Sequence, residues 1–335
     1  MPDRGQPGKM ERHGVAVPRC PGSGNSSGAS LQPNGYGGRV AVVCPICECA
    51  QFRVLLVTRP HRKELKGEYS IVECRKCGCV YLNPRLTDDL LSSAYALLEA
   101  GDGAERFAER LETKPVNALT RHWRRFCSYR VAEAVPQGPV IDLGCNRGEL
   151  IEELLARGLE ASGVESSPAA VSYCKMRGLQ VQQARLEDFR IPRGQYRTVV
   201  LSHVLEHLQD PVGVLKDVAA SLPDDGSVVI CVPHVRSPMR WLFGAHWHGW
   251  DPPFHLVHYD SRSVSAVCDM AGLEVVKIAK RMIPDDLRRS LLLWRGKSGR
   301  QLVLRVLSVP VLCSLSCFGF GSYLLVTAKL APRDR

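Results

Sequence analysis

The segment that most constrains the fold is "VIDLGCNRGELIEELLARG", residues 140–158. An apolar run ends at an aspartate, two glycines bracket a short turn, and apolar residues then recur at helical spacing. Val140 and Ile141 therefore predict a buried strand, and Gly144 and Gly148 predict a turn without room for side chains. Such a turn lets the backbone approach a ligand and directs helix N–H groups at it. The segment predicts a ligand site, but by itself it leaves a dinucleotide, a phosphate and another nucleoside open.

Strand and helix patterns alternate from about residue 138 onward. Strands are expected at 139–143, 161–165, 179–184, 198–202, 227–232 and 273–280. Helices are expected near 148–157, 167–177, 210–222 and 261–271. This alternation predicts an α/β fold with a doubly wound, Rossmann-like sheet.

Composition divides the rest of the chain into segments. Residues 1–40 are rich in Gly, Ser, Pro and Asn and predict a disordered tail. Residues 41–90 hold two cysteine pairs, and residues 91–135 read as a helical connector that covers the ligand cleft. Residues 136–335 form the α/β domain, with an apolar helical insertion at about 285–320 before a closing strand, "YLLVTAKL".

The two cysteine pairs, "CPIC" and "CRKC", predict a structural zinc site of the zinc-ribbon type. Four thiolates from two tight turns make a closed tetrahedral site with no position for water. The expected ligands are Cys44, Cys47, Cys74 and Cys77. Cys49 and Cys79 lie close by and could replace one of them. Ordinary reduced thiols are the alternative.

The glycine turn resembles motif I of the class I S-adenosylmethionine-dependent methyltransferases. Asp142 ends the strand and is followed by Gly144-x-x-x-Gly148, whereas a dinucleotide site requires G-x-G-x-x-G. The next strand ends at Glu165, where an acid can take both ribose hydroxyls. The same geometry serves NAD enzymes, which therefore remain the alternative. Asn146 stands where such families usually carry glycine.

Two further stretches carry the resemblance. "VVLSHVLEHLQDPVGVLKDVAASLPDDGSVVICVP" is similar to the fourth strand, helix and fifth strand of these methyltransferases, and "CRKCGCVYLNPR" resembles the zinc-ribbon leader of many bacterial relatives. The resemblance implies S-adenosylmethionine as cofactor, with adenine contacts after the third strand. The implied cofactor-binding residues are Asp142, Gly144, Cys145, Asn146, Gly148, Glu165, Leu186, Glu187 and Ser202.

"SHVLEHL" places His203, Glu206 and His207 at spacings that share one face of a helix. Three such ligands could hold a divalent metal. The ubiquinone-pathway O-methyltransferases look similar here, and the resemblance implies a metal site in them. The alternative is that Glu206 and His207 only fix the loop.

"WLFGAHWHGWDPPFHLVHYD", residues 241–260, holds three tryptophans and four histidines. It follows the fifth strand, where a ligand meets the carboxyl edge of the sheet, so we expect an aromatic wall of the substrate pocket. His255 is the expected general base, because a neutral imidazole can take a hydroxyl proton. His203 and His207 complete the candidate catalytic set. The alternative is a packed aromatic loop.

Charge is uneven along the chain, whose formal net charge is +10. Residues 1–40 and 281–335 are basic, whereas residues 41–280 hold equal numbers of basic and acidic side chains. A neutral middle disfavours an RNA or DNA methyltransferase, and "SHVLEH" replaces the "N-P-P-Y"-type motif. A non-catalytic protein that keeps the cofactor fold is the other rival. We expect an O-methyltransferase acting on a small or carrier-linked acceptor such as a saccharide, a lipid or a secondary metabolite.

Residues 306–326 contain no charged side chain and follow a basic stretch that includes Arg288, Arg289 and Arg295. The run is long enough to span a bilayer, but it holds a proline, two glycines and four serines. We expect peripheral contact with an anionic membrane; a core or homodimer helix is the alternative. The chain opens without a secretory signal pattern, so a cytoplasmic location is expected.

Overall fold

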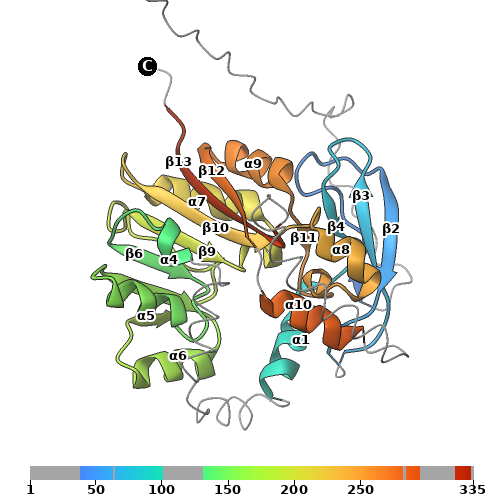
Figure 1. Ribbon diagram of the computed structural model, residues 1–335, viewed down its shortest axis with the longest axis horizontal. Coiled ribbons are helices and arrows are strands. Elements are labelled where there is room, and N and C mark those ends of the chain that lie inside the picture. Colours follow the sequence, from blue (N-terminus) through green and yellow to red (C-terminus); the bar gives the residue numbers. More distant parts are fainter. Residues whose placement is uncertain (1–37, 63–64, 101–130, 282–283, 295–320, 333–335) are drawn as a thin grey trace, which may run out of the picture.

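The computed structural model describes residues 38–62, 65–100, 131–281, 284–294 and 321–332. Two sheets organise these residues (Figure 1). A seven-stranded sheet occupies one side of the molecule, and a four-stranded sheet built mainly from the cysteine-rich segment occupies the other.

The seven-stranded sheet has the order β12-β13-β10-β9-β6-β7-β8. Strands β6 to β10 of this sheet run parallel, and β13 lies antiparallel between β10 and β12. The predicted doubly wound α/β fold is therefore confirmed. The strands are β6 (Val140–Leu143), β7 (Ala161–Glu165), β8 (Val181–Gln183), β9 (Thr198–Ser202), β10 (Ser227–Pro233), β12 (Leu273–Arg281) and β13 (Tyr323–Leu330).

Helices cover both faces of this sheet, because central strands bury side chains in both directions. Val229 of β10 packs with α4 (Val131–Ala134) and α5 (Glu149–Ala156), and α6 (Pro168–Met176) follows β7. Val228 and Ile230 face the opposite way, toward α7 (Pro211–Ser221) and α9 (Ser261–Met270). Side-chain oxygens of Ser167, Asp210 and Asp260 cap three of these helices.

The four-stranded sheet has the order β11-β4-β3-β2. Its strands are β2 (Phe52–Thr58), β3 (Tyr69–Cys74), β4 (Val80–Leu82) and β11 (Val257–His258), and β1 (Arg39–Val40) pairs separately with β5 (Arg85–Leu86). Strand β11 comes from the α/β domain. Arg236 adds a second link, since it contacts both Glu73 of β3 and Asp260. The cysteine-rich segment is thus built into the α/β domain.

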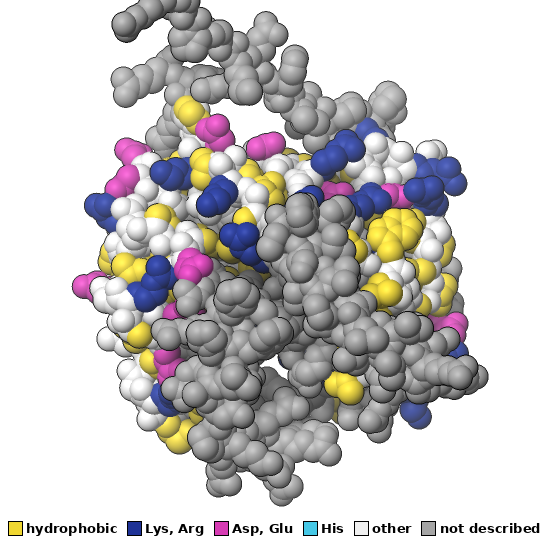
Figure 2. Space-filling view, in the orientation of Figure 1, with side chains coloured by type: hydrophobic (Ala, Val, Ile, Leu, Met, Phe, Trp, Pro, Cys, Tyr) yellow, Lys and Arg dark blue, Asp and Glu magenta, His cyan; other side chains and the backbone are white. Residues whose placement is uncertain are grey.

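Further helices and 3-10 turns complete the described part of the chain, and α1, α8 and α10 can be followed in Figure 1. They are α1 (Asp88–Ala100), η1 (Leu205–His207), α8 (Pro238–Phe243), η2 (Gly244–His246), η3 (His248–Trp250) and α10 (Pro284–Leu293). On the face shown in Figure 2, basic and acidic side chains are interspersed over the described surface.

The carboxyl-terminal apolar run is described only in its last part. Residues 323–330 form β13, so "YLLVTAKL" is the closing strand of the sheet, as expected. Helix α10 occupies the start of the predicted insertion, and residues 295–320 lie outside the described residues. Among the helices that are described, none combines the length and apolarity needed to cross a bilayer. The predicted disordered tail lies outside the described residues up to residue 37, as does most of the predicted connector.

Candidate functional site

The glycine turn after β6 folds as a ligand cradle. Gly144 and Gly148 have φ of +73° and +71°, which favours glycine. A Cβ on Gly144 would lie 2.7 Å from Val204 Cγ2, and one on Gly148 would lie 2.4 Å from Leu179 Cδ1. The turn therefore excludes side chains at both positions.

Asn146 takes the position where similar sequences carry glycine. Its φ of +47° lies in the left-handed region, which asparagine tolerates better than most residues. Its backbone N–H donates to Glu165 Oε2 at 2.9 Å. Cys145 is buried, and its Sγ occupies the space that a Cβ on Gly163 would require. The turn thus keeps its shape without the usual glycine.

Glu165 ends β7 beside this turn. Its Oε1 accepts hydrogen bonds from Ser167 N at 2.8 Å and from Ser166 Oγ at 3.2 Å. With the Asn146 bond, these contacts fix the carboxylate at the carboxyl edge of the sheet. Oε1 already accepts two hydrogen bonds and Oε2 accepts one, so Oε2 keeps a lone pair that can accept from a ribose hydroxyl.

Asp142 is the buried acid of the cradle. It is 3% exposed, and its Oδ1 has no hydrogen-bond partner among the described residues. Burial, and then the charge of Glu165, raises the pKa of Asp142 to about 8. An unpaired buried carboxyl oxygen is costly unless a ligand satisfies it. The residue therefore fits a site that receives a cationic or hydrogen-bonding group such as the ammonium of S-adenosylmethionine.

The remaining implied cofactor residues lie at the same edge. Leu186 is half-buried and packs against the core. Glu187 is exposed, with its Oε2 3.7 Å from Arg185 Nε. Ser202 is half-buried at the end of β9.

The expected helical face of His203, Glu206 and His207 is not formed. His203 has φ of +59°, and only the single 3-10 turn η1, Leu205–His207, follows it. Its Nδ1 nevertheless lies 3.3 Å from Glu206 Oε1. The left-handed backbone conformation of His203, directly after β9, turns the chain, and only one 3-10 turn follows.

A buried Glu–His–His cluster forms at this turn. One ligand atom from each of Glu206, His207 and His255 lies within 4.8 Å of the others. Glu206 is 1% exposed, and in the described part of the chain neither of its carboxylate oxygens has a hydrogen bond of good geometry. Burial alone would raise the pKa of Glu206, but His203, His207 and His255 together lower it to about 2. The cluster thus holds an anionic carboxylate between imidazoles.

Hydrogen bonds to carbonyl oxygens fix the tautomers of the two imidazoles. His255 Nδ1 lies 2.9 Å from Gly249 O, and His207 Nδ1 lies 3.1 Å from Phe254 O. A carbonyl oxygen only accepts, so each Nδ1 carries a proton, and the atom that can gain or lose a second proton is Nε2. Burial, and then His255, lowers the pKa of His207 to about 4.

The sequence did not indicate Tyr95 as a site residue. Its hydroxyl lies 3.2 Å from His207 Nδ1, and its ring lies 4.6 Å from that of Phe254. No motif marks Tyr95, since it lies on α1, far from the other site residues in sequence.

Residues 241–260 do not form the full aromatic wall of a substrate pocket that we expected. Trp247 and Trp250 are fully buried, whereas Trp241 is 74% exposed. The two buried indoles donate to Asp286 Oδ2 and to Gly244 O. Two of the three tryptophans therefore pack inside the loop, where the Trp250 ring lies 4.9 Å from that of His258, instead of lining a substrate pocket.

The four predicted zinc ligands converge. Sγ atoms of Cys44 and Cys77 lie 3.4 Å apart, and those of Cys47 and Cys74 lie 3.5 Å apart. A zinc tetrahedron with Zn–S bonds of about 2.3 Å has edges of about 3.8 Å, so the group fits zinc.

The two turns that carry these ligands repeat each other. Glu48 N donates to Cys44 O and Gly78 N donates to Cys74 O, and both donors have positive φ. Cys49 and Cys79 occupy matching positions, and their Sγ atoms approach backbone oxygens and lie outside the group of four sulfurs. The Cys79 side chain also interacts with that of Cys44.

The chain is similar to known methyltransferases. A model of a methyltransferase domain matches residues 116–278. The ubiquinone biosynthesis O-methyltransferase of Acinetobacter baylyi is 26% identical over 164 residues, which are 42% of this chain and 68% of that protein. The corresponding enzyme of Marinobacter nauticus is 29% identical over 141 residues, which are 39% of this chain and 58% of that enzyme.

Among solved structures, an S-adenosylmethionine-dependent methyltransferase from Mesorhizobium loti is similar, with a TM-score of 0.43 and 15% identity. The similarity covers 59% of this chain and 95% of that one.

Proposed function

Because the chain belongs to the class I S-adenosylmethionine-dependent methyltransferases, we propose that it methylates a hydroxyl oxygen of a small or carrier-linked acceptor. The relatives named above are O-methyltransferases. S-adenosylmethionine supplies the sulfonium methyl group when bound. Asp142, Glu165 and the turn from Gly144 to Gly148 would hold it at the carboxyl edge of the sheet.

The arrangement of Glu206 and His255 carries the proposal. A hydroxyl that attacks a methyl group must lose its proton. His255 Nε2 accepts that proton, because Nδ1 already donates to Gly249 O. The buried Glu206 carboxylate then stabilises the imidazolium. Positioning of the acceptor accounts for the rest of the rate.

The test is His255→Ala, with His246→Ala as the matched control, since His246 is exposed in the same segment and lies outside the cluster. Methyl transfer from tritiated S-adenosylmethionine is measured on a panel of phenol, sugar-alcohol and amine acceptors. His255→Ala should lower turnover roughly 10²–10⁴-fold and leave S-adenosylhomocysteine affinity unchanged. Equal turnover in the two variants would contradict the assignment.

A divalent cation is the second candidate for activating the hydroxyl. Glu206, His207 and His255 lie within ligand distance of each other, and carbonyl-bound Nδ1 atoms are typical of metal-ligating histidines. Activity that survives EDTA excludes this candidate. Activity lost in EDTA and restored by added metal, with the cysteine-bound zinc unchanged, supports it over the base.

The four cysteines would hold a structural zinc ion. The matched turns and the fourfold sulfur set support this assignment. The zinc completes a folding element and leaves no position open for chemistry.

A further inference from the structure

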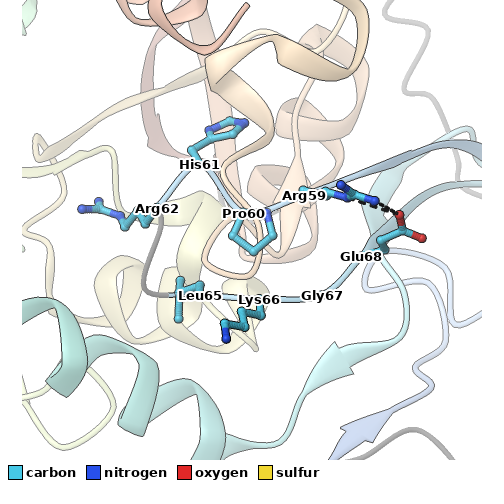
Figure 3. Close-up of a pocket in the computed structure, with 8 residues that line it drawn as sticks. All are labelled: Arg59, Pro60, His61, Arg62, Leu65, Lys66, Gly67 and Glu68. Carbon is cyan, nitrogen blue, oxygen red and sulfur yellow. Dashed lines mark hydrogen bonds and ion pairs between the residues drawn. The ribbon is translucent and has the colours of Figure 1, made fainter.

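The loop between β2 and β3 lines an open pocket. Its volume is about 460 Å³, which falls within the range of small-molecule sites. The residues that line it are Arg59, Pro60, His61, Arg62, Leu65, Lys66, Gly67 and Glu68 (Figure 3). We call it the β2–β3 pocket.

The charge of the β2–β3 pocket is carried by Arg62 and Lys66. Arg59 is neutralised, since its Nη2 and Nε lie 2.8 Å and 3.3 Å from Glu68 Oε1. Figure 3 shows this pair at one end of the loop, away from Arg62 and Lys66. Within the described part of the chain, neither of those two cations forms an ion pair.

His61 adds no charge at neutral pH. Burial lowers the pKa of His61 to about 4, although Asp251, whose Oδ1 lies 3.6 Å from its Nδ1, acts in the opposite direction. The pocket therefore presents the positive charges of Arg62 and Lys66 on exposed side chains. Asp251 is the acid near Arg62, since burial alone would raise the pKa of Asp251 and Arg62 is among the charges that lower it below its ordinary value.

The pocket adjoins the cluster through Phe254. The guanidinium carbon of Arg62 lies 5.8 Å from the Phe254 ring centroid, and the carbonyl of Phe254 accepts from His207. Arg62 is thus separated from the cluster by one residue. Phe254 is buried and lies between the pocket and the cluster, so an acceptor carried on a bound ligand would have to displace its ring to reach His255.

We propose that the β2–β3 pocket binds the phosphate or diphosphate of a carrier that delivers the acceptor, with the hydroxyl to be methylated placed at His255. This assignment rests on the proposed function. A phosphate group carries roughly two negative charges at neutral pH, which complements the positive charges of Arg62 and Lys66. Arginine binds phosphate oxygens in a bidentate manner, and lysine adds a point charge.

Calorimetry with inorganic pyrophosphate tests the pocket directly on the full-length, zinc-loaded protein. Arg62→Gln and Lys66→Gln should each weaken binding about tenfold or more, because each removes a charge-assisted contact. Arg157→Gln and Lys216→Gln remove equal charge from exposed positions on the α/β domain and should leave the affinity unchanged. Zinc content and thermal unfolding confirm that each variant is folded.

The outcome that overturns the proposal is equal pyrophosphate affinity in the wild type and all four variants. The source of the phosphate is separated by two further probes. Tighter binding of UDP than of pyrophosphate indicates a nucleotide carrier, and tighter binding of farnesyl diphosphate indicates an isoprenoid carrier. Equal binding of all three supports recognition of the anion alone.

O-methylation and anion binding at the β2–β3 pocket can be tested independently. His255→Ala should keep its pyrophosphate affinity, because the pocket cations do not depend on that imidazole. If no hydroxyl acceptor is methylated while pyrophosphate binding still requires Arg62 and Lys66, O-methylation is wrong and the anion site stands. If methyl transfer to an uncharged hydroxyl proceeds and pyrophosphate does not bind, the pocket assignment is wrong.

Discussion

At the scale of single residues, Asp142 lowers the stability of the ligand-free protein while it provides a carboxyl group for ligand binding. Its carboxyl group is buried with one unpartnered oxygen, and burial raises its pKa to about 8. The unfolded chain loses this proton near the ordinary value of 3.8. Between these values the native state binds more protons than the unfolded state, so its stability falls as the pH rises toward 8.

Asp142→Asn should therefore stabilise the ligand-free protein. We expect the free energy of unfolding to exceed that of the wild type by about 1 kcal/mol or more at pH 7.5. The difference should be small at pH 4 and should widen up to about pH 8. Denaturant unfolding of both proteins across this range measures it. Asp224→Asn, at an exposed position, is the control. A difference that does not change with pH would contradict this account of Asp142.

At the scale of elements, the two cysteine turns act as one folding unit. They close on each other through the sulfur cluster, and strand β4, which follows the second turn, pairs with β11 just after His255. Arg236 joins the same sheet to the N-terminus of α9. Loss of the zinc should therefore disturb the acceptor side of the site more than the cofactor side.

The variants Cys47→Ser and Cys49→Ser test which cysteines bind the zinc ion. Cys47→Ser should lose zinc and lower the melting temperature, since structural zinc binding supplies folding free energy. Cys49→Ser should keep about one zinc per chain, because its Sγ lies outside the cluster. Elemental analysis and thermal unfolding measure both effects. Zinc retained in Cys47→Ser and lost in Cys49→Ser would reverse the ligand assignment.

At the scale of the whole molecule, the features that depend on local sequence patterns could be predicted, whereas the features that depend on tertiary contacts could not. Strands β7 and β9 span the predicted residues 161–165 and 198–202, because their apolar runs end at clear turn signals. The convergence of the four predicted zinc ligands followed from the spacing of the two C-x-x-C pairs. Each of these features depends on residues that are close in sequence.

The acceptor side depended on contacts between distant segments. Glu206 meets His255 only because the turn after β9 packs against the loop after β10, and a strained His203 replaced the expected helix. The tryptophans of residues 241–260 gave no signal that two would be buried. The β2–β3 pocket, likewise, lies on a loop that carries no motif.

The central claim is that the cradle after β6 binds S-adenosylmethionine, and calorimetry with S-adenosylhomocysteine tests it most directly. Asp142→Ala and Glu165→Ala should each weaken binding by about 1.5–3 kcal/mol, because each removes charge-assisted hydrogen bonds. Glu160→Ala, an exposed acid just before the opposite end of β7, should bind like the wild type. Wild-type affinity in both the Asp142 and the Glu165 variants would contradict the account.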